Sequence, residues 1–482
     1  MRNQQVAPLV AALRRSRDRP DAAFYAPGHK RGQGISPLMV ELLGDRVFQA
    51  DLPELPELDN LFAPEGAIAE AQALAAELFG ATHTWFLVNG STCGIEAAIL
   101  ATCQPGDKLI LPRNCHQSAI AALVLSGAVP VFISPTVDDW GMAHSITPSQ
   151  LAHTLAQHPD AKAVLLVYPT YYGTCGDIWA IAQIAHHYQI PLIVDEAHGA
   201  HFAFHPDLPM PSLEAGADIV IQSTHKVLGA MTQASMLHSQ GNLIDPERIR
   251  RALAFVQSTS PSYLLLASLD AARYQMAQHG RSLMSQTLRL ATWASDRLSA
   301  TPGLAVFDPH TAPGCTAGDR TRLTVSVSNL GISGYKADDI LREHLGVTCE
   351  LPSLQTLTFI VSLGNTETDV ECLVAGFTHL AAQLGDRPST QVTAVSIPPL
   401  PQVQLSPREA FFAATETVSV EQSIGCVAAE LVCPYPPGIP ALVPGETITP
   451  QAIAHLLQVL ALGGAITGCA DPSLATIRVI QR

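Results

Sequence analysis

The sequence of 482 residues is short of charged residues, and of positive charge above all. Charged residues make up 14% and hydrophobic residues 47%, a balance that argues against a disordered chain and supplies large buried cores. Only 27 residues are Lys or Arg against 42 Asp or Glu, so the net charge is −15. A surplus of this sign repels nucleic-acid phosphates and anionic membranes, and it is compatible with a cationic small substrate.

The sequence also lacks paired cysteines and long apolar runs. Its ten cysteines form no C-x-x-C pair, so neither a zinc site nor a thioredoxin-like motif is indicated. No apolar run approaches the ~20 residues that a membrane-spanning helix needs. Residues 1–20 show neither the apolar core nor the cleavage site of a signal peptide. We therefore expect a reduced, cytoplasmic protein without a metal site.

Changes in composition and in the pattern of apolar residues along the chain predict four regions. Residues 1–64 combine a short helix with Gly- and Pro-rich loops, and residues 65–300 form a large domain. Residues 301–394 read as an α+β small domain, and residues 395–482 as a C-terminal subdomain that begins with the Pro-rich linker at 395–407.

The large domain alternates short, almost wholly apolar strands with helices. This alternation is typical of a parallel or mostly parallel sheet that is covered on both faces, and it predicts an α/β fold. The expected strands are 84–89, 108–112, 129–134, 163–169, 191–197 and 218–223.

Two strand ends carry candidate cofactor-binding residues. The pair indicates a cofactor site more specifically than either residue does alone. STHK (223–226) places Lys226 beside hydroxyl residues, which suits a Schiff-base lysine, although alone such a Lys is more often structural. VDEAH (194–198) places Asp195 where it needs a cation, either a core Lys or Arg or a protonated pyridine nitrogen. The two residues are 31 positions apart, the length of one strand-to-strand crossover. This spacing predicts a pyridoxal 5′-phosphate (PLP) site, with Asp195 bracing the ring nitrogen.

Two more turns follow predicted strands. NGSTCG (89–94) offers Gly90, Ser91 and Thr92 to a phosphate at a helix N-terminus, although such a turn alone is more often an ordinary N-cap. NCHQS (114–118) places His116 where an imidazole could stack over the cofactor ring. Because the chain has 18 His, only the position of His116 makes it a candidate.

Taken together, these segments resemble the fold-type-I PLP enzymes and, more narrowly, the bacterial-type ornithine/lysine/arginine decarboxylases. The resemblance covers nearly the whole chain and implies an aspartate-aminotransferase-like large domain with a mostly parallel sheet, followed by an α+β small domain. It rests on FYAPGHKRG (24–32), the DNL and APEG of 59–66, NGST (89–92), RNCHQS (113–118), VDEAHGAH (194–201), STHK (223–226), QSTSPSY (257–263) and PYPPGIPALVPGE (434–446).

The resemblance implies a role for each matching residue. Lys226 would hold the cofactor, Asp195 would pair with its ring nitrogen and His116 would be the base stacked on the ring. His198 would lie near the cofactor and the substrate, and Glu446 would form a wall of the substrate pocket. The residues implied around the phosphate are Gly90, Ser91, Thr92, Ser223 and His225.

The resemblance also bears on assembly. The resemblance implies an obligate dimer whose subunits share their active sites, so QSTSPSY would reach the active site of a neighbouring subunit. The long bacterial members carry an extra N-terminal receiver-like domain, and this chain resembles the short branch without it. We therefore expect a homodimer or higher homo-oligomer, without assuming a decamer.

The resulting hypothesis is PLP-dependent decarboxylation of a small basic amino acid, with arginine favoured over lysine and ornithine. Lys226 or His225 would return a proton to Cα. The distal cationic group of the substrate would need acids, offered by Glu446 or by a loop that could equally be a solvated face. That loop carries Asp51, Glu54, Glu57 and Asp59.

Two rival hypotheses remain open. An aminotransferase or C–S lyase on the same fold could grip the α-carboxylate of its substrate with Arg322, Arg342 or Arg478. A non-catalytic PLP-fold binding protein is the second rival, and it would show no visible absorbance from a lysine-bound cofactor.

Overall fold

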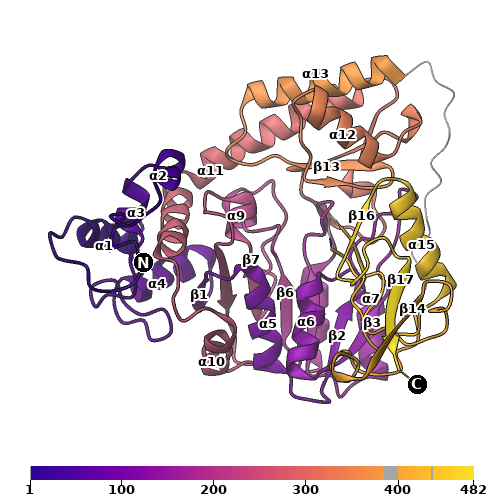
Figure 1. Ribbon diagram of the computed structural model, residues 1–482, viewed down its shortest axis with the longest axis horizontal. Helices are drawn as coiled ribbons and strands as arrows, with labels where there is room; N and C mark the ends of the chain where they lie inside the picture. Colours follow the sequence, from indigo (N-terminus) through magenta and orange to yellow (C-terminus); the bar gives the residue numbers. More distant parts are fainter. Residues whose placement is uncertain (1, 385–399, 436–437, 482) are drawn as a thin grey trace. The chain divides into compact units, whose positions relative to one another are not determined.

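The computed structural model describes residues 2–384, 400–435 and 438–481. The described chain divides into two compact units (Figure 1). Unit 1 is Met1–Ala101, Ile193–His205 and Met210–Leu283, and unit 2 is Thr102–Leu192, Pro206–Pro209 and Met284–Arg482. The domain boundaries expected after residues 64, 300 and 394 stay predictions. The last of them, with residues 395–399 of the expected linker, lies outside the described residues.

Unit 1 contains four hydrogen-bonded strands in the order β1-β8-β7-β6. β6 and β7 run parallel, with Asp195 opposite Ile221, whereas β8 is antiparallel to both β7 and β1. Their apolar residues are almost fully buried, as expected of strands covered on both faces. The strands are β1 (His83–Leu87), β6 (Leu192–Asp195), β7 (Ile219–Gln222) and β8 (Ser235–Ser239).

The helices of unit 1 begin and end where the sequence has Pro, Gly or a polar cap. α4 stops at Gly80, whose φ of 78° is left-handed and suits a residue without Cβ. α1 packs on α4, and Figure 1 shows α1–α3 in indigo beside it. The helices are α1 (Pro8–Arg17), α2 (Pro37–Leu43), α3 (Arg46–Ala50), α4 (Ala67–Phe79), α5 (Gly90–Thr102), α9 (Thr224–Val227), α10 (Pro246–Val256) and the first part of α11 (Tyr263–Ser299).

Unit 2 begins with a second set of parallel strands, in which β2 pairs with both β3 and β4. Helices between them continue the βαβ pattern. These elements are β2 (Lys108–Pro112), α6 (Gln117–Ser126), β3 (Val129–Ile133), α7 (Pro148–Gln157), β4 (Ala163–Val167), β5 (Thr174–Cys175) and α8 (Ile178–His187).

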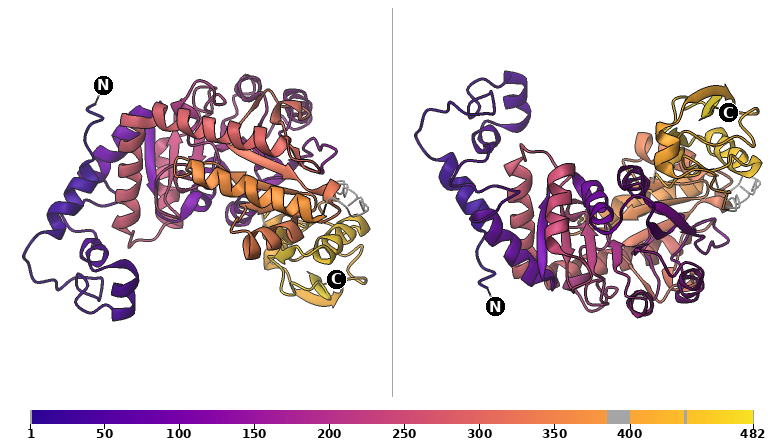
Figure 2. Two further views of the ribbon diagram at one scale, coloured as in Figure 1. Left: turned by 90° about the horizontal axis from the view of Figure 1, so that it is seen from above. Right: turned by 90° about the horizontal axis from the view of Figure 1, so that it is seen from below.

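The rest of unit 2 has an antiparallel sheet of order β12-β13-β11-β9, on which α12, α13 and the second part of α11 form one apolar core. Figure 2 shows α13 in orange alongside that part of α11. The elements are β9 (Ala305–Val306), β10 (Ala317–Gly318), β11 (Arg322–Ser326), α12 (Gly334–His344), β12 (Leu351–Pro352), β13 (Thr356–Ile360) and α13 (Glu367–Leu384).

The C-terminal part of unit 2 has its own apolar core, built around α15 and the pair β14–β17. β15 pairs with β16. The elements are α14 (Pro407–Phe412), β14 (Thr415–Ser419), β15 (Cys433–Tyr435), α15 (Pro450–Ala461), β16 (Ala465–Thr467) and β17 (Thr476–Ile480).

Each of the six strands expected in the large domain is present, with small shifts at its ends. β8 was not expected. Its sequence SMLHS is polar at three of five positions, although all five residues are buried, so it shows no continuous apolar run. None of the helices in the described ranges is long and apolar enough to cross a membrane.

Candidate active site

Lys226 lies on α9, a single helical turn that follows β7 directly. The Lys226 Nζ atom is 3.1 Å from His198 Nε2. His198 is buried and comes three residues after the end of β6. The turns after two neighbouring parallel strands therefore bring the amine and an imidazole together within unit 1.

The NGST turn forms the N-terminus of α5 beside the same turn. Gly90 has a φ of 76°, a left-handed conformation that favours glycine, and it opens the helix. The Ser223 hydroxyl donates a hydrogen bond to Ser91 Oγ at 2.8 Å. A helix N-terminus and two hydroxyls at one place form a cradle suited to a phosphate.

Gln233, Gln257 and Ser258 support this cradle, and of these the sequence analysis did not single out Gln233. Gln257 accepts a hydrogen bond from Val88 N, and Gln233 donates to Val88 O. Ser258 N donates to Asn89 Oδ1. The beginning of QSTSPSY therefore holds the NGST turn of its own chain. The expectation that this segment reaches a neighbouring subunit stays a prediction.

Asp195 is the last residue of β6 and is half-buried. Its Oδ1 accepts a hydrogen bond from Ala197 N at 3.2 Å. Ile221, opposite Asp195, faces α5, because a Cβ added at Gly94 would lie 2.9 Å from Ile221 Cγ2. Since paired residues of a sheet share a face, Asp195 lies on the face that α5 covers, the side of the phosphate cradle.

His225 precedes Lys226 and has a strongly perturbed acidity. Burial, and secondly the charge of Lys226, lower the pKa of His225 to about 4. The imidazole is therefore neutral at pH 7 and can accept a proton. Its ring would supply one neutral base beside the amine.

The opposite face of the same strands holds a buried polar chain that sequence reasoning missed. Glu196 is 0% exposed and accepts hydrogen bonds from Ser212 and from Gln222 Nε2. Gln222 Oε1 lies 3.1 Å from His238 Nε2, and His238 Nδ1 lies 2.7 Å from Thr84 Oγ1. The signal that could have drawn attention to Glu196 was a second acid, next to Asp195, at the end of an apolar strand.

His116 and Glu446 both belong to unit 2. His116 is the N-cap of α6, where its Nδ1 accepts a hydrogen bond from Ser118 N at 3.2 Å. Glu446 is 1% exposed, and its Oε2 pairs with Arg113 Nη2 at 2.9 Å. Burial raises the pKa of Glu446, and Arg113 opposes that rise.

The acidic loop at 51–59 is occupied by contacts within unit 1. Asp51 pairs with His29, and Glu57 with Arg19. Asp59 accepts hydrogen bonds from backbone N–H groups at the start of α4; burial raises its pKa, but these bonds together outweigh burial and lower it. Glu54 is hydrogen-bonded to Asn60 and Leu61. These contacts favour a structural role for the loop.

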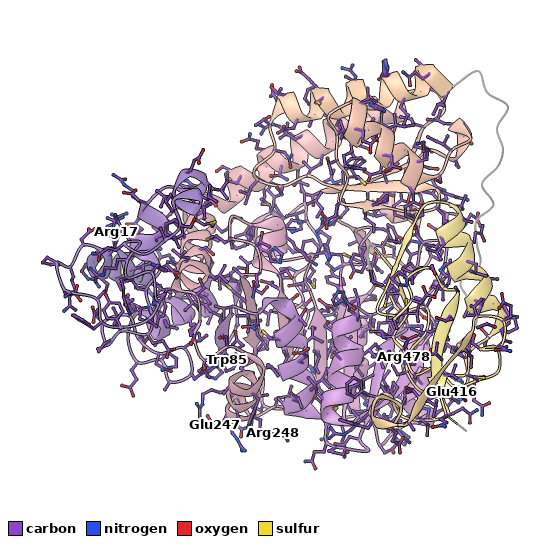
Figure 3. All side chains as sticks on the ribbon, in the orientation of Figure 1. Arg17, Trp85, Glu247, Arg248, Glu416 and Arg478 are labelled. Atoms are coloured by element: carbon purple, nitrogen blue, oxygen red, sulfur yellow. The ribbon has the colours of Figure 1, made fainter. Side chains whose placement is uncertain are left out.

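The three arginines named for the rival hypothesis differ in position. Arg322 on β11 is buried, with its Nε 3.9 Å from Asp319 Oδ2. Arg342 pairs with Asp339 at the surface of α12. Arg478 is exposed on β17 and is labelled in Figure 3. Of the three, Arg322 alone is buried.

The donor set of unit 1 fits PLP. A primary amine, a carboxylate on the neighbouring strand and a hydroxyl-lined helix N-terminus match the aldehyde, the ring nitrogen and the phosphate of that cofactor. Thr224, next to Ser223, adds a buried Oγ1 with no hydrogen-bond partner in the described residues. The described residues contain no cluster of three metal-ligating side chains.

The chain is similar to known decarboxylases along most of its length. Residues 7–319 match the Orn/Lys/Arg decarboxylase major domain, and residues 390–465 match the C-terminal domain of the same family. The chain is 40% identical to the arginine decarboxylase of Bacillus subtilis, with 99% of each chain covered. It is 41% identical to that of Halalkalibacterium halodurans, covering 100% of this chain and 99% of the other.

More distant proteins share the fold. The chain is 25% identical to the lysine decarboxylase LdcA of Pseudomonas aeruginosa, covering 94% of this chain and 75% of that one. The crystal structure of the Francisella novicida lysine decarboxylase LdcF matches with a TM-score of 0.84 at 23% identity, covering 99% and 81%. An aminotransferase from Bacillus subtilis matches with a TM-score of 0.53 at 16% identity, covering 68% and 87%.

These matches bear out the resemblance drawn from the sequence motifs, including the aspartate-aminotransferase-like fold with its mostly parallel strands and α+β small domain. The family match spans both the large domain and the C-terminal part. The chain belongs to the Orn/Lys/Arg decarboxylase family and is an amino-acid decarboxylase.

Proposed function

We propose that this decarboxylase uses PLP to convert arginine to agmatine and CO₂. The observation that carries the choice of arginine is the near-complete match, at 40% and 41% identity, to two arginine decarboxylases. The lysine decarboxylase LdcA of Pseudomonas aeruginosa is only 25% identical. PLP itself is supported by the amine, carboxylate and phosphate cradle that unit 1 brings together.

The residues that would hold the cofactor lie in the turns after β1, β6 and β7. Lys226 would bind its aldehyde carbon, and Asp195 would hold a proton on the ring nitrogen. When bound, PLP supplies a conjugated electron sink for the bond that breaks at Cα. The phosphate would be held by Gly90, Ser91, Thr92, Ser223 and His225.

Two neighbouring residues of α9, His225 and Lys226, support a role in proton transfer. His225 is neutral at pH 7 because its pKa is about 4. Lys226 has an imidazole partner in His198. Lys226 would deliver a proton to Cα after CO₂ leaves, and His198 would orient the amine. His225, being neutral, would accept a proton rather than supply one.

Two residues of unit 2 complete the proposal. His116 would stack on the cofactor ring, as the resemblance implies. Glu446 would contact the substrate's guanidinium: its Oε1 is buried and has no hydrogen-bond partner in the described chain, while its Oε2 is held by Arg113 and Val443 N. A buried acceptor with this vacancy suits a cationic donor.

We further propose that the active form is at least a homodimer with shared active sites. Support comes from the N-terminal segment, where large apolar side chains are exposed. Phe24 is 94% exposed, and Leu38 and Leu42 on α2 are 75% and 73% exposed. An apolar surface of this kind in one short segment is typical of an interface.

The test is to incubate the purified protein with PLP and, separately, with arginine, lysine or ornithine, without any keto acid. We expect CO₂ and agmatine from arginine, with much lower turnover of the other two amino acids. Formation of an oxo acid would instead favour the aminotransferase alternative. Absence of both CO₂ release and visible cofactor absorbance would favour a non-catalytic protein.

A further inference from the structure

Polar side chains cross four neighbouring strands of unit 1 on a single sheet face. Thr84 on β1 lies directly opposite His238 on β8, and His238 is opposite Val220 on β7. Gln222 is two residues beyond Val220, so it points to the same face. Glu196 follows Asp195 and lies beside Gln222, to which it is hydrogen-bonded. The row therefore runs from β1 to the end of β6.

This row is buried from solvent. Glu196 and His238 are each 0% exposed, and Gln222 is 3% exposed. The Phe79 ring of α4 covers the His238 ring with 4.8 Å between the centroids. Apolar residues at these positions would give a simpler core, because each buried polar group costs stability unless it is hydrogen-bonded.

The hydrogen bonds of the row have a single consistent direction. Gln222 Nε2 donates to Glu196, so Gln222 Oε1 must accept from His238 Nε2–H. His238 Nδ1 is then an acceptor, and the Thr84 hydroxyl donates a hydrogen bond to it. Every donor points towards Glu196, where Ser212 adds a backbone and a hydroxyl donor.

Glu196 is unusual because its partners in the described chain are all neutral. Burial raises the pKa of Glu196 to about 7, against the lowering effect of Ser212 and Gln222. Burial also lowers the pKa of His238 to about 3, so that ring stays neutral. No ion pair among the described residues explains why an acid is placed here, and a core-packing role alone does not need an acid.

Residues of this row directly precede or follow residues of the candidate site along the chain. Glu196 follows Asp195, and Glu196 N donates to Ile221 O, which extends the β6–β7 pairing by one residue. Gln222 precedes Ser223, whose hydroxyl reaches Ser91. The Glu196–Gln222 hydrogen bond thus joins the two strand ends immediately before their chains turn towards His198 and Lys226.

We infer that Glu196, Gln222 and His238 are positioning residues that fix the ends of β6 and β7, and thereby hold Asp195 and Lys226 in the geometry that binds PLP. This inference rests on the proposed PLP site. Asp195 and Lys226 act on one face of the sheet, and the row on the other face clamps the strands that carry them. Because their side chains lie on that other face, none of the three positioning residues would touch the cofactor.

The direction of the hydrogen bonds allows an exchange test. E196Q places two amide NH₂ groups opposite each other unless the Gln222 amide and the His238 tautomer both reverse. Q222E places two buried carboxyl groups opposite each other. The double variant E196Q/Q222E restores complementarity, because the new amide at 196 still accepts from Ser212 and donates to the new carboxylate at 222, which accepts from His238.

A matched control is available in the same unit. Asp270 is 0% exposed, and its carboxylate binds Arg273, Leu9 N and Val10 N. D270N therefore disturbs a buried polar cluster that holds α1 and has no link to β6 or β7. Any loss that is common to E196Q and D270N reflects general destabilisation.

The experiment measures PLP binding to the apo form of each full-length variant, the absorbance of the bound cofactor, and the apparent melting temperature of the apo form. We expect E196Q to weaken PLP binding about 10- to 100-fold, the effect of losing one or two buried hydrogen bonds. D270N should change the affinity for PLP less than about threefold, as expected of a substitution at a distant, independent site. E196Q/Q222E should recover to within about threefold of the wild type.

Two results would overturn the inference: equal PLP affinities of E196Q and D270N at matched melting temperatures, or no recovery in the double variant. If the Q222E variant does not fold, the PLP affinities of E196Q, D270N and E196Q/Q222E still test the inference. Failure of the proposed function has a separate signature, a wild type that binds PLP yet releases no CO₂ from arginine. A wild type that does not bind PLP would overturn both.

Discussion

Asp195 and Glu196 are consecutive residues at the end of β6, yet their carboxylates lie on opposite faces of the sheet. Asp195 is half-buried on the face of α5 and the phosphate cradle, where a cofactor cation could reach it. Glu196 is fully buried among neutral donors. One strand end thus carries a residue proposed for chemistry on one face and a residue proposed for positioning on the other. Substitutions on the two faces should therefore fail in different ways.

The largest effect should come from the chemical face. We expect K226A to reduce decarboxylation by at least about 10³-fold, because Lys226 is the amine proposed to bind the cofactor aldehyde. Its melting temperature should stay near that of the wild type, since the Lys226 side chain is only half-buried. CO₂ release and thermal melting measure the two quantities. K108A, at an exposed pair with Asp160, is the control. Retention of activity in K226A would refute the site.

The buried glutamate of unit 2 sharpens the comparison, because unlike Glu196 it has a cation partner. We expect E446Q to cost about 3–5 kcal/mol of stability, since Arg113 would keep a buried charge without its counter-ion. Melting at pH 7 should show a larger loss for E446Q than for E196Q, and the KM for arginine should also rise. An exposed control is R478A on β17 (Figure 3). Equal losses would mean that the two glutamates are equivalent.

D195N tests the chemical face without changing the size of the side chain. We expect kcat/KM to fall about 10- to 150-fold, the value of one charge-assisted hydrogen bond of ~1.5–3 kcal/mol. The apo melting temperature should hardly change, because the amide oxygen can still accept from Ala197 N. E196Q is the comparison at the next residue: it should lower the apo melting temperature, and its activity should fall through weaker PLP binding. A D195N variant with full activity would remove the proposed ring-nitrogen partner.

The smallest effect concerns the pH dependence of stability on the buried face. The folded pKa of Glu196 is about 7 against an ordinary value of 4.5, so the folded state keeps a proton that the unfolded chain releases. Stability from this group is therefore present below pH 4.5 and is lost as the pH rises to about 7. We expect the stability of the wild type relative to E196Q to fall by ~1–3 kcal/mol between pH 5 and 8.

The measurement is the difference in melting temperature between wild type and E196Q across this pH range. Taking the difference removes the contribution of His238, which is present in both proteins. Because the pKa of His238 is lowered, that contribution changes with pH in the direction opposite to that of Glu196. A constant difference would show that Glu196 does not change protonation on folding. A difference that grew with pH would show that its charged form is the stabilised one.

Several site residues could be predicted because their position follows from local chain order. Asp195 ends an apolar strand, and Lys226 and Ser91 lie within a few residues of the end of another; strand ends can be recognised from five or six neighbouring residues. In the structure the turns carrying Lys226 and Ser91 lie side by side, since Ser223 is hydrogen-bonded to Ser91. The catalytic roles of these residues remain proposals.

Other features could not be predicted from local order. β8 is buried but polar at Ser235, His238 and Ser239, so its sequence does not read as a core strand. The partners of Glu446 were hidden because Arg113 lies 333 residues away in sequence. Such pairs depend on how distant segments pack, which spacing along the chain does not encode.

The sequence by itself determined the family, the alternation of strands and helices, and the residues at each strand end, because these depend on short-range pattern and on motifs. Only the tertiary structure decided which strands became neighbours. Thr84 and His238 are 154 residues apart and meet because β1 pairs with β8. That pairing turns Glu196, an unexplained acid beside Asp195, into the end of a buried hydrogen-bond chain, since cross-strand contacts exist only after the sheet has formed.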